Sequence, residues 1–382
     1  MNTQTVFVER EEDHQVNGLF GGFLALTWGQ ALMIGIGLGL IYLAIVKQYE
    51  PVLLLPIGFG AIISNIPFSS AVGDHGFLTI LYRAGIITEL FPLLIFIGVG
   101  AMIDFGPLLS QPFTIFLGAA AQLGIFLTML MAALAGYPLK EAAAIGIIGA
   151  ADGPTSIYVA TKFAPRLLGP ISVAAYSYMS LVPIIQPPVI RALTTREERR
   201  IKMPPVAAVE IPRRTRILFP IIVTLLAGMI APESVALVGS LMFGNLLRES
   251  GVVDRLSRSA QNELANLTSL FLGITIGSTM KAEQFLTPTT LVIIAMGFVA
   301  FVLDTAGGVL FAKFLNLFRK DKINPMIGAC GISAFPMSAR IVQKMAQKED
   351  EQNFVLMQAV GANVAGQIAS VIAGAMVLAL VR

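Results

Sequence analysis

Long apolar stretches separated by short polar segments most constrain the fold of this chain. Only 13% of the residues are charged, against about 25% in soluble domains, and the mean hydropathy is +0.78. Hydrocarbon offers backbone groups no water, so such a chain must form helices that satisfy their own hydrogen bonds. We therefore predict an all-α polytopic membrane protein. The stretches lie at about 30–46, 51–67, 84–103, 112–135, 141–162, 169–190, 216–231, 234–247, 265–280, 289–313, 323–341 and 354–380.

Composition excludes several kinds of site. The single cysteine, Cys330, excludes a disulfide framework and a cysteine metal cluster. The only histidines are His14 and His75, so we expect no transition-metal site. The net charge of +3 is small and no basic patch indicates nucleic acid as a partner.

Charge and hydropathy divide the chain into four parts. Residues 1–28 comprise a polar, acidic tail and a short interfacial helix. The tail, at 1–17, lacks the pattern of a signal peptide, and the helix lies at about 19–26. Residues 29–190 form a first membrane repeat. Residues 191–215 are rich in arginine, which places this linker on the cytoplasmic side. Residues 216–382 form a second membrane repeat.

Short similarities in the same order relate the two halves. Their offsets lie between 177 and 180 residues, and internal repeats of this kind are typical of secondary transporters, whose sites are built from paired broken helices. We expect the two repeats to be inverted. The matched positions are Asn65 with Asn245, Gly100 with Gly277, 108–112 with 285–288, Gly149 with Gly328, and Met179 with Met357.

Asp152 is the strongest candidate for a functional residue. It lies in an apolar stretch, and Gly153 and Pro154 break the helix directly after it. A charged aspartate near a bilayer centre costs roughly 2.5–3.5 kcal/mol. We interpret Asp152 as a cation ligand or proton carrier, aided by unwound carbonyl groups. The alternatives are a helix cap in a polar pocket and a residue at the membrane surface.

The matching break in the second half runs from Asn324 to Arg340. It offers Asn324, Ser333 and free backbone oxygens beside Gly328. Arg340 either binds an anionic substrate, acts as a counter-ion to Asp152, or extends to the interface from a helix end.

Other polar residues lie in apolar surroundings. Asn363 and Gln367 share one helix face and either supply amide oxygens to an ion or join helices. Tyr178 is a proton donor or gate, or an interfacial tyrosine. Asp304 is a secondary candidate, and Asp104 is expected to cap a loop. Glu89 faces either a cavity or an interface.

These segments resemble the beta subunits of the sodium-pumping, biotin-dependent decarboxylases over nearly the whole chain. The most specific strings are 146–155, 174–179 with 183–188, 322–328 continuing to 340, and 363–366. The long polar insertion that some members carry after the second span is short here, at 67–83.

The resemblance implies decarboxylation of carboxybiotin, with consumption of a proton and export of Na⁺. It places the family's functional residues on Asp152, Tyr178, Asn324, Gly328, Ser333, Arg340 and Asn363. We thus expect catalytic roles for Asp152, Tyr178 and Arg340, and Na⁺ ligands at Asp152, Asn324, Ser333 and Asn363. Arg340 is the expected carboxybiotin-binding residue.

The implied fold is two inverted repeats with broken helices, similar to elevator-type carriers. The implied cofactors are Na⁺ and the biotin of a partner. The expected partners are a biotin-carrying carboxyltransferase (alpha) subunit, a small membrane subunit of the gamma or delta type, further copies of the chain, and the lipid of the cell inner membrane. The alternatives are a stand-alone Na⁺-coupled carrier for a small carboxylate and an intramembrane enzyme that moves no ion.

Overall fold

The structure is a computed structural model that describes residues 20–49, 51–204 and 211–381, and these ranges contain helices but no strands. Four helical segments in them are long and apolar enough to cross a membrane, or up to six if each of two bent pairs counts as one span. The prediction of a helical membrane protein with several spans is therefore confirmed.

The helices follow the predicted apolar stretches closely. In the first half they are α2 (Gly21–Leu24), α3 (Trp28–Val46), α4 (Pro51–Ser64), α5 (Phe77–Leu81), η1 (Tyr82–Ile86), α6 (Leu90–Met102), α7 (Gly106–Ser110), α8 (Thr114–Ala121), α9 (Leu123–Leu134), α10 (Leu139–Gly146), η2 (Ile147–Ala150), α11 (Gly153–Phe163), η3 (Pro165–Leu167) and α12 (Leu168–Leu193).

The remaining elements belong to the linker and to the second half of the chain. They are α13 (Arg196–Arg199), α14 (Arg213–Ile230), η4 (Pro232–Ser234), α15 (Val235–Ser250), α16 (Asp254–Ser259), η5 (Ala260–Leu264), α17 (Ala265–Ser278), α18 (Ala282–Phe285), α19 (Pro288–Phe318), η6 (Pro325–Gly331), α20 (Met337–Glu349) and α21 (Leu356–Leu380).

Two details of the helices do not follow the positions of proline. The stretch 51–67 contains Pro56, but α4 is one continuous helix of 14 residues. Conversely, the stretch 112–135 is interrupted at Gln122, where no proline lies. At the N-terminus, α2 occupies part of the expected interfacial helix, while residues 1–19 lie outside the described ranges.

The two halves contact each other reciprocally. Asn65, after α4, donates to the carbonyl of Met280 beyond α17 at 2.7 Å. Asn245 in α15 donates in the same way to the carbonyl of Ile103 after α6, at 3.1 Å. The helix pairs are α4 with α17 and α6 with α15, so each pair joins one helix from each half.

Two broken hairpins lie at the centre of the molecule. The first consists of α10, η2 and α11, and an ion pair of 2.5 Å between Arg166 and Glu141 joins its ends. The second consists of η6 and α20. Both of its ends lie at the linker, because the Asn324 amide donates to the Arg199 carbonyl at 2.9 Å and Arg199 pairs with Glu349 at 2.8 Å. The hydrogen bond and charge of Arg199 lower the pKa of Glu349.

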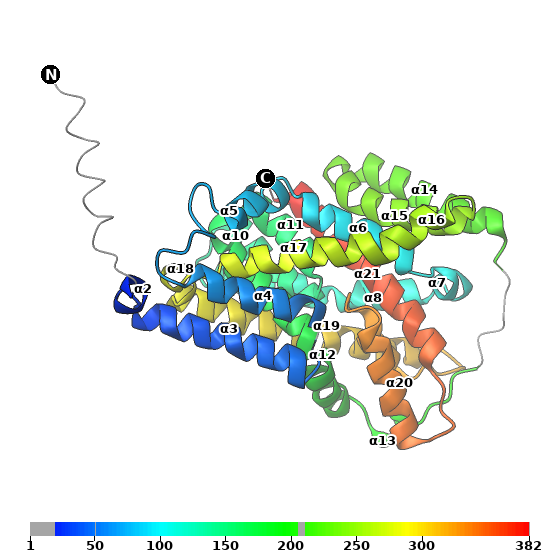
Figure 1. Ribbon diagram of the computed structural model, residues 1–382. Coiled ribbons are helices and arrows are strands. Elements are labelled where there is room, and N and C mark those ends of the chain that lie inside the picture. Colours follow the sequence, from blue (N-terminus) through cyan, green and yellow to red (C-terminus); the bar gives the residue numbers. More distant parts are fainter. Residues whose placement is uncertain (1–19, 50, 205–210, 382) are drawn as a thin grey trace.

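The hairpins enter the molecule from opposite ends. Helix α12 has 26 residues, is bent by 66° within its length, and leads from the base of the first hairpin to the linker, so it separates the two bases. In Figure 1, α20 descends towards α13, whereas α10 and α11 lie at the other end of the view. The tips meet between these ends, where the Ser333 amide donates to the Ala150 carbonyl at 3.0 Å.

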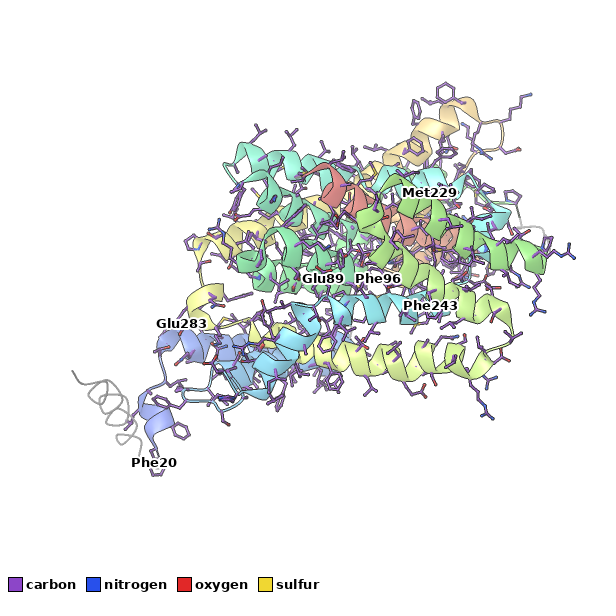
Figure 2. The ribbon with its side chains drawn as sticks, turned by 90° about the horizontal axis from the view of Figure 1, so that it is seen from above. Phe20, Glu89, Phe96, Met229, Phe243 and Glu283 are labelled. Carbon is purple, nitrogen blue, oxygen red and sulfur yellow. The ribbon has the colours of Figure 1, made fainter. Side chains whose placement is uncertain are left out.

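Large apolar side chains cover much of the outside. Phe20, Met229 and Phe243, labelled in Figure 2, are 66%, 75% and 50% exposed. Such extensive apolar exposure is unusual for a soluble monomer and fits a surface in contact with lipid.

Candidate functional site

The break in the first hairpin positions Asp152. The 3₁₀ segment η2 ends at Ala150, and Ala151 adopts a left-handed conformation with φ 51°. Asp152 is extended and caps α11, because its Oδ1 accepts the Thr155 amide at 3.2 Å. A Cβ on Gly153 would lie 2.3 Å from the Tyr176 ring, so glycine is needed for this close packing.

Both halves of the chain contribute partners to the carboxylate. Asp152 Oδ2 accepts hydrogen bonds from Ser333 Oγ at 3.1 Å, Gln367 Nε2 at 3.2 Å and Ser370 Oγ at 2.7 Å. Asp152 is only 3% exposed. The carboxylate therefore lies at the contact between the two hairpin tips and α21, where its partners are neutral donors.

One face of α21 lines this contact. Asn363, Gln367 and Ser370 are four and three residues apart, so they lie along the same side of the helix. The Asn363 amide donates to the carbonyl of Ile332 at 2.7 Å, next to Ser333 at the second tip. Asn363 Oδ1 is buried and has no hydrogen-bond partner among the described residues.

Oxygen atoms dominate this cluster. The Asp152 carboxylate, the hydroxyl groups of Ser333 and Ser370 and the amide oxygen of Asn363 are hard ligands that suit Na⁺ better than a transition metal. Hydroxyl groups rotate, so those that now donate to Asp152 can turn a lone pair to a cation. The arrangement can therefore bind a small cation in a space closed to bulk solvent.

The structure does not bring every predicted residue to this cluster. Asn324 caps η6 through the Met326 amide, and its own amide binds the linker. The Tyr178 hydroxyl donates to the carbonyl of Ile294 in α19. Arg340 is exposed on α20, and no ion pair joins it to Asp152 within the described ranges. The alternative of a counter-ion to Asp152 is therefore wrong for this conformation.

The predicted backbone positions lie at close helix contacts. Pro154 occupies the first turn of α11. A Cβ on Gly328 in η6 would lie 2.0 Å from the carbonyl oxygen of Gly308 in α19, so two backbones touch there.

The three secondary acidic residues differ. Asp104 accepts the Gly106 amide at 2.8 Å, which confirms the expected loop cap. Glu89 begins α6 and lies 3.9 Å from Lys162. Asp304 is fully buried in α19.

Reasoning from sequence missed two site residues. Ser370 lies seven residues after Asn363, and this spacing could have placed it on the same face of α21. Tyr176 packs on Gly153, but its position in an apolar span gives no signal that distinguishes it from Tyr178.

We predict that Ser370→Ala raises the Na⁺ concentration needed for half-maximal activity roughly tenfold, because the variant removes one oxygen ligand of the ion, and a polar contact to a charged group contributes about 1.5 kcal/mol or more. The measurement is Na⁺-dependent turnover of the assembled complex. Ser172→Ala is the control, since the Ser172 hydroxyl is equally buried and lacks a partner in the described part of the chain. Equal Na⁺ dependence in both variants would contradict the role of Ser370.

Comparison with known proteins identifies the family of this chain. The family model of the Na⁺-transporting oxaloacetate decarboxylase beta subunit matches residues 29–381. The glutaconyl-CoA decarboxylase beta subunit of Acidaminococcus fermentans is 52% identical over 360 residues, covering 94% of this chain and 95% of that protein. The methylmalonyl-CoA decarboxylase beta subunit of Propionigenium modestum is 49% identical, covering 94% and 96%. The oxaloacetate decarboxylase beta chain of Haemophilus ducreyi is 45% identical, with the same coverage.

The resemblance found in the sequence motifs is thereby confirmed. Relatives named for three different acyl substrates align over almost their full length. The chain belongs to the family of Na⁺-transporting oxaloacetate decarboxylase beta subunits, membrane subunits of decarboxylases that export Na⁺.

Proposed function

We propose that this chain decarboxylates the carboxybiotin of a partner subunit and uses the reaction to export Na⁺ through the Asp152 cluster. The observation that carries the proposal is the position of Asp152, a buried carboxylate between the tips of two hairpins that enter from opposite ends. A cation bound there is separated from both sides of the membrane by one hairpin each.

Na⁺ binding would use the oxygens that now surround the carboxylate. Asp152 supplies the charge, and Ser333 and Ser370 supply hydroxyl oxygens once their protons turn away. Asn363 offers an amide oxygen that has no other partner in the described ranges. Gln367 joins this set if its amide turns to present oxygen, an orientation that a hydrogen-bond network decides.

Inverted repeats and elevator-type movement are part of the proposal. The reciprocal contacts of Asn65 and Asn245 support a two-fold relation between the halves. The opposite entry of the hairpins supports inversion. In an elevator-type movement, the unit that carries the site moves against the other unit, so the Asp152 cluster would face one side of the membrane and then the other. The domain boundaries 29–190 and 216–382 are retained as predictions.

Arg340 is the proposed contact for the carboxylate of carboxybiotin. It is exposed on α20, between the linker end and the hairpin tip. Its planar fork suits a carboxylate. Loss of CO₂ breaks the bond from the carboxyl carbon to the biotin nitrogen, and a proton returns to that nitrogen. Tyr178 is the proposed proton relay.

Asn324 has a different proposed role from that expected. Its side chain donates to the Arg199 and Ile201 carbonyls, which holds the base of the second hairpin to the linker. We therefore assign Asn324 a positioning role in this conformation. Gly328 likewise positions η6 against α19.

The named relatives indicate a multi-subunit complex in a membrane. We propose a biotin-carrying carboxyltransferase (alpha) subunit, a small gamma- or delta-type subunit and further copies of this chain as partners, in the cell inner membrane. The acyl substrate follows from the carboxyltransferase, because relatives of this chain serve three different ones.

The test uses the assembled complex in sealed vesicles whose membrane is turned inside out. Export of Na⁺ from the cell then corresponds to uptake of Na⁺ into the vesicle. Addition of carboxylated biotin carrier should drive uptake of labelled Na⁺ that stops when the carboxyl groups are exhausted. Uptake of a dicarboxylate with Na⁺ in the absence of any biotin protein would favour a stand-alone carrier. Decarboxylation without Na⁺ movement would leave only an intramembrane enzyme.

A further inference from the structure

A second buried carboxylate lies behind the first hairpin. Asp304 is in the middle of α19 and is 0% exposed. Its Oδ1 accepts the Ile125 amide at 3.2 Å, at the start of α9 and three residues after the break at Gln122. Its Oδ2 would lie 2.6 Å from a Cβ on Gly149, which is three residues before Asp152. The carboxylate therefore joins a broken helix to the hairpin that carries Asp152.

Two glycines lie against Asp304. A Cβ on Gly124 would lie 2.4 Å from Asp304 Oδ1 and 2.5 Å from the Ala300 carbonyl oxygen, and a Cβ on Gly149 would lie 2.6 Å from Asp304 Oδ2 and 2.9 Å from the Ala300 Cβ. Both neighbouring segments thus approach the carboxylate and the α19 backbone closely.

No cationic side chain in the described part of the chain forms an ion pair with Asp304. Its Oδ2 has no hydrogen-bond partner, and Asp304 takes part in no ion pair within the described ranges. Helices α8 and α9 carry no ionisable side chain. The other elements packed on α19 contribute an exposed Lys140, a Glu141 paired with Arg166, and Asp152, Tyr176, Tyr178, Arg191 and Cys330. Arg191 lies at the linker end of α12. It is far along that helix from Tyr178, which packs beside Gly297 of α19.

Unused oxygen atoms occur on the same elements. Gln122 Oε1 and Thr128 Oγ1, at the break and one turn into α9, are buried without partners among the described residues. Thr305 Oγ1, next to Asp304, is a third. A buried carboxylate oxygen without a donor, on elements that carry three further unpaired side-chain oxygens, is an arrangement that a bound cation would satisfy.

We propose that Asp304 holds a second monovalent cation, either Na⁺ or a proton, at the back of the first hairpin. The inference rests on the proposed function only for the movement of that hairpin. Because Gly149 and Asp152 belong to one short segment, displacement of the tip alters both carboxylate environments together. Occupancy at Asp304 is thereby linked to occupancy at Asp152.

The first test measures how Na⁺ stabilises the purified protein. A ligand that binds only the folded state raises the melting temperature, so two cation sites add two contributions. Asp304→Asn keeps an oxygen for the Ile125 amide and removes the charge. If Asp304 holds Na⁺, this variant should lose part of the Na⁺-induced rise in melting temperature, Asp152→Asn should lose another part, and the double variant should lose both. Choline chloride replaces NaCl in the reference samples.

The outcomes distinguish the two cations. If the cation is Na⁺, Asp304→Asn also exports fewer Na⁺ per decarboxylation. If it is a proton, Asp304→Asn keeps the Na⁺ response and instead flattens the pH profile of turnover. Asp104→Asn, which removes an exposed carboxylate, is the matched control and should change neither. An Asp304→Asn variant with the Na⁺ response and pH profile of the unchanged protein would overturn the proposal.

A second test needs no substitution. Hydrophobic carbodiimides modify protonated carboxyl groups inside membranes, and peptide mapping identifies the modified residue. Na⁺ should protect Asp304 if it binds Na⁺, whereas protection by raised pH alone identifies a proton. Asp304 labelling that depends on neither Na⁺ nor pH would contradict cation binding. Protection of Asp304 with none at Asp152 would refute the proposed Asp152 site while leaving this one intact.

Discussion

Asp152→Asn is expected to weaken Na⁺ activation of decarboxylation by roughly 100-fold. Loss of one charge from a buried ion pair costs about 2–5 kcal/mol. A 100-fold change in the Na⁺ concentration that is needed corresponds to about 3 kcal/mol, within this range. Asparagine has nearly the same size, and the rotatable hydroxyl groups of Ser333 and Ser370 can accept from its amide. The fold should therefore remain, and in the absence of Na⁺ the melting temperature should equal or exceed that of the unchanged protein.

The experiment measures the rate of decarboxylation as a function of Na⁺ concentration. It compares complexes that contain the Asp152→Asn beta subunit with complexes that contain the unchanged beta subunit. Asp104→Asn serves as the control, because Asp104 caps an exposed loop. The melting temperature without Na⁺ separates a lost cation site from a damaged fold. Normal Na⁺ dependence in Asp152→Asn would show that the carboxylate is not a Na⁺ ligand.

Gly328→Ala is expected to destabilise the protein by about 3 kcal/mol, or roughly 4 °C in melting temperature for a chain of this length. The added Cβ would lie 2.0 Å from the Gly308 carbonyl oxygen, far inside the usual separation of about 3.5 Å. Both contacting groups are backbone, so no side chain can turn away. Segment η6 must move, and Ser333 at its end moves with it.

The matched control is Gly35→Ala. Gly35 also lies in a helix, α3, but a Cβ there would meet nothing within 4 Å. Its melting temperature should stay the same or rise slightly, because alanine favours helices. Decarboxylation and melting are measured for both variants. Equal stability of Gly328→Ala and Gly35→Ala would contradict the close backbone contact.

The sequence was informative wherever one local pattern determines structure. Hydropathy located the spans, and glycine and proline indicated breaks near Asp152 and before Ser333. The first break lies one residue before Asp152, at Ala151, because Gly153 and Pro154 begin α11 rather than ending a helix. It was less informative about the gap at Gln122, because no breaking residue marks it. The capping carboxylate for α9 comes from Asp304, 179 residues away.

The residues of the candidate site could likewise be predicted only in part from the sequence. Asp152 was identifiable by its cost in hydrocarbon, and Asn363 by its apolar surroundings. Asn324 was grouped with them through family resemblance, yet its amide binds the linker instead. Which side chains meet depends on how two distant hairpins and α21 pack, and no local pattern contains that information.

The origin of the Asp152 partners has a consequence for biosynthesis. Three of the four groups bonded to this carboxylate come from residues 333–370, which are synthesised after the first hairpin. A chain that contains only the first half therefore leaves most of the acceptor capacity of Asp152 unmet. The site is complete only when the second hairpin and α21 have packed against the first hairpin.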